Sequence, residues 1–190
     1  MDWGKGVRGW TLLTIVSLLF GLIGPSFVSY GAEKPSYLKS ATYYSDDWVV
    51  NFWNSESSHM DEELEKIAED GFNSIILVVP WGEFQPQMLP VRYESYAFDK
   101  LNQVMEAAGR HGLWVILRVG YTWDYSGGEG IERYEKLLYD ESTKQAWLDY
   151  IKKIYEAAAA HDNFYGGFLT WEDFWNFVQT SKKGENQRKA

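Results

Sequence analysis

Apolar residues follow two alternating patterns along this chain. Continuous apolar runs at 74–80 (SIILVVP) and 113–119 (LWVILRV) are rich in β-branched residues, which is typical of strands buried on both faces. Runs at 37–44 (YLKSATYY) and 166–171 (GGFLTW) indicate two further strands, although 49–53 (VVNFW) competes with 37–44 for the first. The sequence therefore predicts four strands.

Helical patterns separate these strands. Ser58 can cap a helix that has acidic residues in its first turn and that Gly71 ends. After a long loop broken by prolines, a second helix has one apolar stripe, made by Phe98, Leu101, Met105 and Ala108. A third amphipathic helix covers 147–158. Strands that alternate with helices predict parallel βαβ units.

The number of units limits the choice of fold. A closed (β/α)8 barrel typically takes about 250 residues, whereas this chain has 190. An open flavodoxin-like sheet fits the length, but the glycine-rich phosphate loop expected after its first strand is absent from the sequence. The long loops rich in polar and aromatic residues all follow strands, where barrel enzymes have their active sites.

The first 31 residues have the pattern of a secretory signal peptide. Two basic residues precede an apolar run at 10–23, and Ser29 and Gly31 are small residues at the −3 and −1 positions of a cleavage site. The run is shorter than the roughly 20 residues that span a bilayer. We therefore expect a secreted or periplasmic product, with an uncleaved membrane anchor as the alternative.

Composition excludes some classes of function. The net charge is −9 and no basic stripe is visible, which argues against nucleic acid as a partner. Aromatic residues make up 17% of the chain. Together with many carboxylates they suit a sugar-binding surface, because ring faces stack on pyranoses and carboxylates accept hydroxyl hydrogen bonds. The alternative is that most of these rings build the core.

No metal or organic cofactor is expected. The chain has no cysteine, which excludes a disulfide framework, a thiolate nucleophile and a cysteine zinc site. Its three histidines, His59, His111 and His161, are never paired at metal-ligand spacing.

Three segments that end or follow predicted strands resemble the second, third and fourth βα loops of clan A glycoside hydrolases, most closely the β-galactosidase-type members. They are VVPWGEFQP (78–86), GLWVILRVGYTWDYSGG (112–128) and GGFLTWEDFW (166–175). The resemblance covers roughly residues 37 to 178. It implies an α/β fold that is the N-terminal half of a (β/α)8 TIM barrel, with about four βα units, and hydrolysis of β-linked glycans with retention.

The resemblance also implies roles for individual residues. Glu172 falls in the position of the acid/base, and burial among the neighbouring rings would disfavour its charged form, as a proton donor requires. The alternative for Glu172 is a place at the mouth of a helix, and Asp173 is expected to cap that helix. Trp171 stands where the family usually has Asn. The residues expected to bind substrate, with loop packing as their alternative, are Trp81, Glu83, Arg118, Tyr121, Trp123, Asp124 and Trp171.

The second carboxylate decides what the chain can do alone. In the family the nucleophile follows the seventh strand, which lies beyond residue 190, so we expect the chain to be inactive by itself. An inverting pair of Asp124 and Glu172 is an alternative, since it needs carboxyl groups about 6.5–9.5 Å apart. The chain could instead be a carbohydrate-binding protein without catalysis, or a half-barrel that works only when it dimerises or is completed by a partner. Its exposed barrel edges would allow self-association. The expected domains are a signal peptide at 1–31, the partial barrel at 32–180 and a polar tail at 181–190.

Overall fold

The computed structural model describes residues 33–49, 51–56, 58–121, 136–137 and 139–169. The chain divides into two compact units, Met1–Tyr30 and Gly31–Ala190, and all the described residues belong to the second. The predicted signal peptide and the predicted polar tail therefore lie outside the described residues. Among the described residues, no helix is long and apolar enough to cross a membrane.

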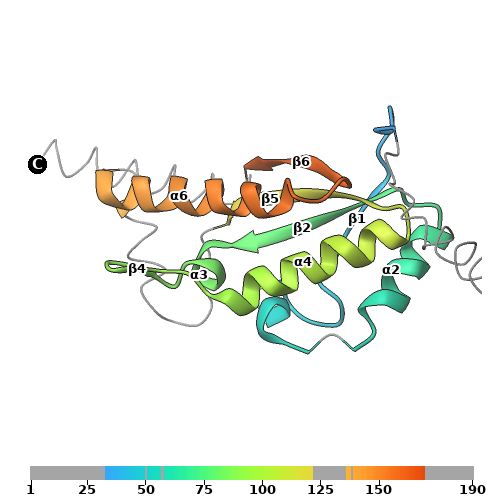
Figure 1. The fold of residues 1–190 in the computed structure, drawn as a ribbon, viewed down its shortest axis with the longest axis horizontal. Coiled ribbons are helices and arrows are strands. Elements are labelled where there is room, and N and C mark those ends of the chain that lie inside the picture. The colour runs from blue at the N-terminus through green and yellow to red at the C-terminus, as the bar shows by residue number, and fades with distance from the viewer. Residues whose placement is uncertain (1–32, 50, 57, 122–135, 138, 170–190) are drawn as a thin grey trace, which may run out of the picture. The chain divides into compact units, whose positions relative to one another are not determined.

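Four parallel strands form the central sheet, and they lie side by side in the order of the chain (Figure 1). They are β1 (Ser40–Thr42), β2 (Ser74–Pro80), β5 (Trp114–Tyr121) and β6 (Phe164–Leu169). This order confirms the predicted βαβ units. The last strand begins at Phe164, two residues earlier than predicted.

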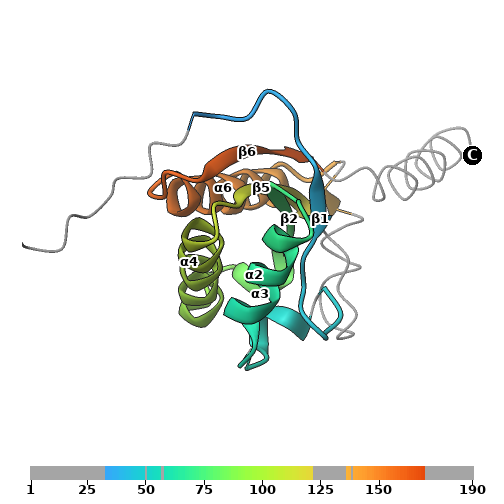
Figure 2. The same cartoon turned by 90° about the vertical axis from the view of Figure 1, so that its right-hand side faces the viewer.

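One long helix connects each strand to the next, and all three helices lie on one side of the sheet (Figure 2). They are α2 (Met60–Glu69), α4 (Ser95–Arg110) and α6 (Glu141–Ala158). The shorter elements are the 3-10 helix η1 (Asn51–Asn54), the helical turn α3 (Trp81–Phe84), and a hairpin of β3 (Gln87–Met88) and β4 (Val91–Arg92). Because the connections all run to the same side, the other face of the sheet has no helix on it among the described residues.

The core lies between the sheet and the three helices. Alternate residues of the two middle strands point into it and are at most 2% exposed; they are Ile75, Leu77, Val79, Val115, Leu117 and Val119. The helices contribute the predicted stripe of α4, in which Leu101, Met105 and Ala108 are fully buried. Burial of apolar surface at roughly 25 cal/mol per Å² makes this layer the main source of stability.

Two local predictions about the first helix and first strand need comment. The segment 49–53 overlaps the 3-10 helix η1 and is not a strand, so the first strand lies within 37–44 as the main prediction had it. The predicted cap Ser58 is wrong, because the N-cap of α2 is His59, whose side chain makes no capping hydrogen bond. Asp61, Glu62 and Glu63 in that turn favour the helix dipole instead.

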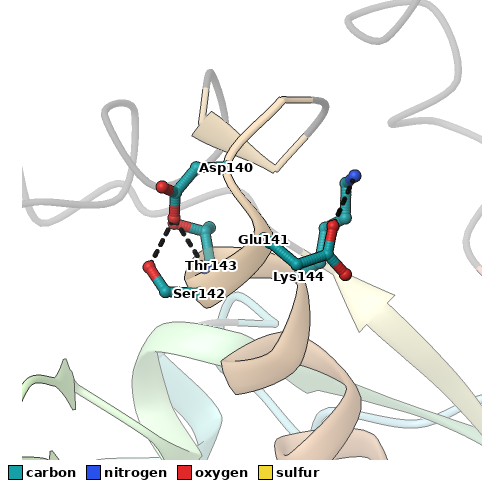
Figure 3. A network of polar contacts seen from close by, with 5 residues as sticks. All are labelled: Asp140, Glu141, Ser142, Thr143 and Lys144. Carbon is teal, nitrogen blue, oxygen red and sulfur yellow. Dashed lines mark hydrogen bonds and ion pairs between the residues drawn. The ribbon is translucent and has the colours of Figure 1, made fainter.

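A hydrogen-bonded cap begins α6 (Figure 3). The Oδ2 of Asp140 accepts hydrogen bonds from the Thr143 amide (2.7 Å), the Thr143 hydroxyl (2.7 Å) and the Ser142 hydroxyl (2.6 Å). These bonds, that from Ser142 first, lower the pKa of Asp140 to about 2. Glu141 pairs with Lys144 one turn on, at 3.1 Å. The start of α6 is therefore fixed by side chains, unlike that of α2.

The segment before β1 crosses to the far strand of the sheet. Lys34 Nζ donates a hydrogen bond to the Tyr165 carbonyl on β6 (3.0 Å) and lies 5.1 Å from the centre of the Tyr165 ring. That ring meets Trp114 of β5 edge to face, with 6.0 Å between ring centres. Residues before the first strand thus contact the last described strand, 131 positions away.

Candidate functional site

A row of three side chains crosses the helix-free face of the sheet near its carboxyl edge. Val78 of β2 is the register partner of Arg118 of β5, and Arg118 is the register partner of Phe168 of β6. The residues on either side of Arg118 point into the core, so Arg118 points to the opposite face. Val78 is 4% exposed and Phe168 is 38% exposed.

Arg118 gives this row its chemistry. Its guanidinium is half-buried, always charged, and carries five N–H donors in a planar fork. Such a group suits carboxylates and pairs of sugar hydroxyls. Its apolar neighbours Val78 and Phe168 lower the local dielectric constant, which strengthens any hydrogen bond made there.

Trp81 lies in the core, although the sequence suggested a sugar contact. Its side chain is 1% exposed, its Nε1 donates a hydrogen bond to Gln85 Oε1 (2.6 Å), and its ring stacks on Tyr150 with 6.4 Å between centres and 27° between planes. Gln85 in turn donates to the Tyr93 hydroxyl (3.1 Å). This geometry favours packing as the role of Trp81, and it identifies Gln85 and Tyr150 as the residues that hold α3 after β2.

Glu83 lies on α3 and is half-buried. Its Oε2 accepts a long hydrogen bond from the Tyr96 hydroxyl on α4 (3.4 Å). Burial, followed by the charges of Glu83 and Glu94, raises the pKa of Tyr96 to about 12. Glu83 is therefore connected to the start of α4 through Tyr96.

The carboxyl end of β5 carries the next group of predicted residues. Tyr121 is the last residue of the strand, and its backbone is in register with Pro80 of β2. Gly120 before it has φ +77°, and a Cβ there would come within 2.8 Å of Trp147 Cζ2 on α6. The strand thus ends tightly against a helix. Four predicted residues lie outside the described part of the chain: Trp123, Asp124, Trp171 and Glu172.

Glu172 lies outside the described residues, so it can be related to β6 only by its position in the sequence. The strand ends at Leu169, and Glu172 follows three positions later. β6 is the fourth strand of the sheet. The sequence predicts that the acid/base follows the fourth strand. Among the described strands, the fourth is β6, the one before Glu172.

The turn after β1 was missed as a contributor to this edge. Tyr44 packs on Val49 and Val78, and its ring meets that of Trp48 edge to face at 6.3 Å and 62°. The sequence shows the aromatic residues of this turn. They were not considered as binding residues, because the alternative prediction made 49–53 a strand of the core.

Two hollows lie beside the helices. One of about 670 Å³ is bordered by η1 and α4, with Trp53, Tyr96 and Lys100 among its residues. Another of about 530 Å³ lies between the turn after β1 and α2. Neither includes Val78, Arg118 or Phe168. In the described ranges, no group of three or more His, Cys, Asp or Glu side chains could hold a metal ion.

Solved glycoside hydrolase structures share this fold. A GH5_18 protein from Bifidobacterium longum subsp. longum ATCC 55813 in complex with Manβ1-4GlcNAc has a TM-score of 0.56 and 17% identity, over 70% of this chain and 33% of that chain. The exo-β-1,4-mannosidase Op5Man5 from Opitutaceae bacterium strain TAV5 has a TM-score of 0.59 and 20% identity, over 68% of this chain and 24% of that one. A GH5_18 protein from Streptomyces cattleya in complex with GlcNAc has a TM-score of 0.56 and 21% identity, over 66% and 31%.

These similarities confirm the resemblance to clan A glycoside hydrolases at the level of fold. The chain spans a quarter to a third of the length of the structures it matches. No family model matches the chain, and no curated protein does either. The described residues thus have the α/β fold of a partial TIM barrel, with the first four strands in place.

Proposed function

We propose that this chain supplies the proton-donor half of a retaining glycoside hydrolase that acts on β-linked glycans. The observation that carries the proposal is the sheet itself, whose four parallel strands in chain order match GH5 structures, with Glu172 following the fourth strand. A manno-oligosaccharide is the substrate class we favour, because two of the similar structures are an exo-β-1,4-mannosidase and a complex with Manβ1-4GlcNAc.

The proposed mechanism divides the chemistry between two carboxyl groups. Glu172 gives its proton to the glycosidic oxygen as the bond to the anomeric carbon breaks. A second carboxylate, about 5–5.5 Å away, attacks that carbon from the other side and forms a glycosyl ester. Water then cleaves the ester, and Glu172 takes the proton of the water. The second carboxylate belongs to the other half of the barrel, so the proposal makes this chain inactive alone.

Other residues of the chain would bind the sugar. We propose that Arg118, beside Val78 and Phe168 in the sheet, donates hydrogen bonds to the sugar. The further residues that we propose for substrate binding are Glu83, Tyr121, Trp123, Asp124 and Trp171. Trp81 would act indirectly, by fixing α3 beneath them.

A carbohydrate-binding protein without catalysis is the second candidate. It is supported by the row of Val78, Arg118 and Phe168, which offers donors and an apolar ring to a sugar without any reaction. Among the described residues, β1 and β6 each pair with one strand only. The open edges of such a sheet can take another strand, so self-association through them would complete a barrel-like assembly.

We also propose export of the protein, with cleavage after Gly31. The basic start, the short apolar run and the small residues before the cleavage site support this. N-terminal sequencing of the exported product is expected to begin at Ala32. Recovery of Met1 on a membrane-bound form would favour the anchored alternative.

The test of the proposed function is complementation. The chain is assayed for hydrolysis of Manβ1-4GlcNAc and of cellobiose, whose leaving sugars need a proton, alone and co-expressed with a polypeptide that supplies the remaining barrel strands. We expect turnover only in the complemented form and its loss in Glu172→Gln. Turnover by the chain alone would show that it holds both carboxylates, and full activity of complemented Glu172→Gln would remove Glu172 from the mechanism.

A further inference from the structure

Trp48 is the most exposed tryptophan in the described part of the chain. Its side chain is 53% exposed, whereas Trp53 and Trp81 are 1% exposed and Trp114 is 8% exposed. An indole ring gains more by burial than almost any other side chain. A tryptophan that stays largely in solvent therefore needs an explanation in the structure around it.

The turn that leads to Trp48 is held rigidly by α2. The Tyr43 hydroxyl donates a hydrogen bond to Glu63 Oε2 (2.6 Å), and the Ser45 hydroxyl donates one to Glu63 Oε1 (2.8 Å). The Glu63 carboxylate thus accepts hydrogen bonds from the residues on both sides of Tyr44. Burial and the Glu63 carboxylate raise the pKa of Tyr43, so its hydroxyl stays protonated as the donor.

Backbone bonds fix the rest of the turn. The Asp47 amide bonds to the Tyr44 carbonyl (3.2 Å), and the Phe52 amide bonds to the Trp48 carbonyl where η1 begins (2.9 Å). The backbone of Trp48 is therefore held from both directions. A ring presented from such a turn loses little conformational freedom when a ligand stacks on it.

The ring also lies next to the predicted site. Tyr44 contacts Trp48 edge to face and packs on Val78, which is the register partner of Arg118. The turn after β1 and the row around Arg118 therefore meet on the same face of the sheet. Asp46 and Asp47 directly precede Trp48, so the same turn carries two carboxylates.

We infer that Trp48, supported by Tyr44, is a stacking platform for one sugar unit of a β-linked oligosaccharide. The apolar face of a pyranose matches the indole face, and carboxylates alongside accept bonds from the sugar hydroxyls. The inference rests on the proposed function and adds a binding contact from the first βα loop, in which the sequence indicated none.

The experiment measures binding of Manβ1-4GlcNAc to the full chain by isothermal titration calorimetry, with maltose as an α-linked comparison. The variants are Trp48→Ala, Trp48→Phe and the control Tyr37→Ala. Tyr37 is also an exposed aromatic residue (75%), but it precedes β1 at the opposite end of the strand. We expect Trp48→Ala to weaken binding about tenfold, Trp48→Phe to retain most of it, and Tyr37→Ala to leave it unchanged.

The outcomes separate this inference from the proposed function. If wild type and Trp48→Ala bind Manβ1-4GlcNAc with equal affinity, the platform is overturned and the proposed function is unaffected. If Tyr37→Ala weakens binding as much as Trp48→Ala, the platform is also overturned, because the effect would then not be specific to Trp48. Binding of neither sugar by wild type overturns the platform, whereas the proposed function is decided by the complementation assay. An NMR titration of the wild type gives a second readout. The indole N–H resonance of Trp48, identified by its absence in Trp48→Phe, is expected to shift when the sugar binds. If the sugar binds and this resonance does not move, the platform is rejected without relying on the stability of any variant.

Discussion

Arg118 and Phe168 are register partners on neighbouring parallel strands, and both side chains lie on the sheet face without helices. The glycine before Phe168 confirms the orientation, because a Cβ on Gly167 would lie 2.5 Å from the Tyr155 hydroxyl of α6. Arg118, with its charged guanidinium, is thus the neighbour of the exposed Phe168 at the carboxyl edge of the sheet. Such pairing of charge and ring is suited to a polar ligand with an apolar face.

Arg118→Lys is expected to weaken binding of Manβ1-4GlcNAc roughly tenfold, because the ammonium keeps the charge but loses the planar set of donors. Calorimetric titration measures the effect, and thermal unfolding checks the fold. The control is Arg110→Lys, which changes an exposed pair with Asp61 on the surface of α4. Unchanged affinity in Arg118→Lys would exclude Arg118 from the sugar contacts.

Glu172→Gln in the complemented enzyme is expected to reduce kcat/KM on a manno-oligosaccharide, which reports the bond-breaking step, by roughly 10²–10⁴-fold. The loss on 4-nitrophenyl β-mannoside is expected to be smaller, because nitrophenolate leaves without a proton. Steady-state kinetics on both substrates measure the difference. Asp173→Asn is the control and is expected to change stability rather than rate. An equal loss on both substrates would contradict a proton-donor role.

Gly120→Ala is expected to destabilise the chain more than Gly112→Ala. Both glycines have positive φ, +77° and +70°, so each substitution carries a conformational cost of about 1–2 kcal/mol. At Gly112 a Cβ meets nothing within 4 Å, whereas at Gly120 it meets Trp147 at 2.8 Å. Overpacking adds about 1–3 kcal/mol at Gly120 alone. Urea unfolding of both variants measures the difference, and equal values would show that Trp147 moves aside freely.

Lys100→Met is expected to lower the free energy of unfolding by about 1–3 kcal/mol. Lys100 is 7% exposed and donates to the carbonyls of Phe52 and Ser55, which hold η1 against α4. Methionine fills the space but removes the charged donor from both carbonyls, and the Phe52 carbonyl keeps only the Ser55 hydroxyl (3.1 Å). Denaturant unfolding measures the loss. The control Lys153→Met removes a lysine whose described contacts are with the rings of Tyr93 and Phe98, so a similar loss there would argue against the carbonyl explanation.

Asp140 is expected to make stability depend on pH in the acid range. Its folded pKa is lowered from 3.8 to about 2, so its contribution is present above about pH 4 and is lost as the pH falls towards 2. Asp140→Asn keeps an acceptor at the cap and removes the titration, whereas Asp140→Ala removes both. We therefore expect Tm near neutral pH to fall in both variants, and further in Asp140→Ala. Across the acid range, Asp140→Asn should lose less Tm than wild type; parallel curves would disprove the assignment.

The sequence predicted the strands better than the site. The runs at 74–80 and 113–119 were identifiable because strands inside a parallel sheet are apolar on both faces, with Arg118 as the exception. The start of the last strand was less clear, because Gly166 and Gly167 carry no side-chain pattern. The order of the strands followed from their alternation with helices, since consecutive βα units usually lie side by side.

The role of Trp81 could not be predicted in the same way. A tryptophan directly after a strand looks the same in sequence whether it faces a ligand or the core. Its burial depends on Tyr150, which is distant in the chain, and on Gln85, whose amide is an unusual partner for a buried indole. Trp123, Asp124, Trp171 and Glu172 stay predictions, because they lie outside the residues that the structure describes.

The agreement between strand order and chain order has a consequence for synthesis. Each strand of the described sheet pairs only with the strands of adjoining βα units, so a unit that leaves the ribosome can dock on the one made just before it. No strand of that sheet has to wait for a partner from the distant end of the chain, and none has to be threaded between two that are already paired. The sheet is therefore suited to grow vectorially, one βα unit at a time, while translation continues.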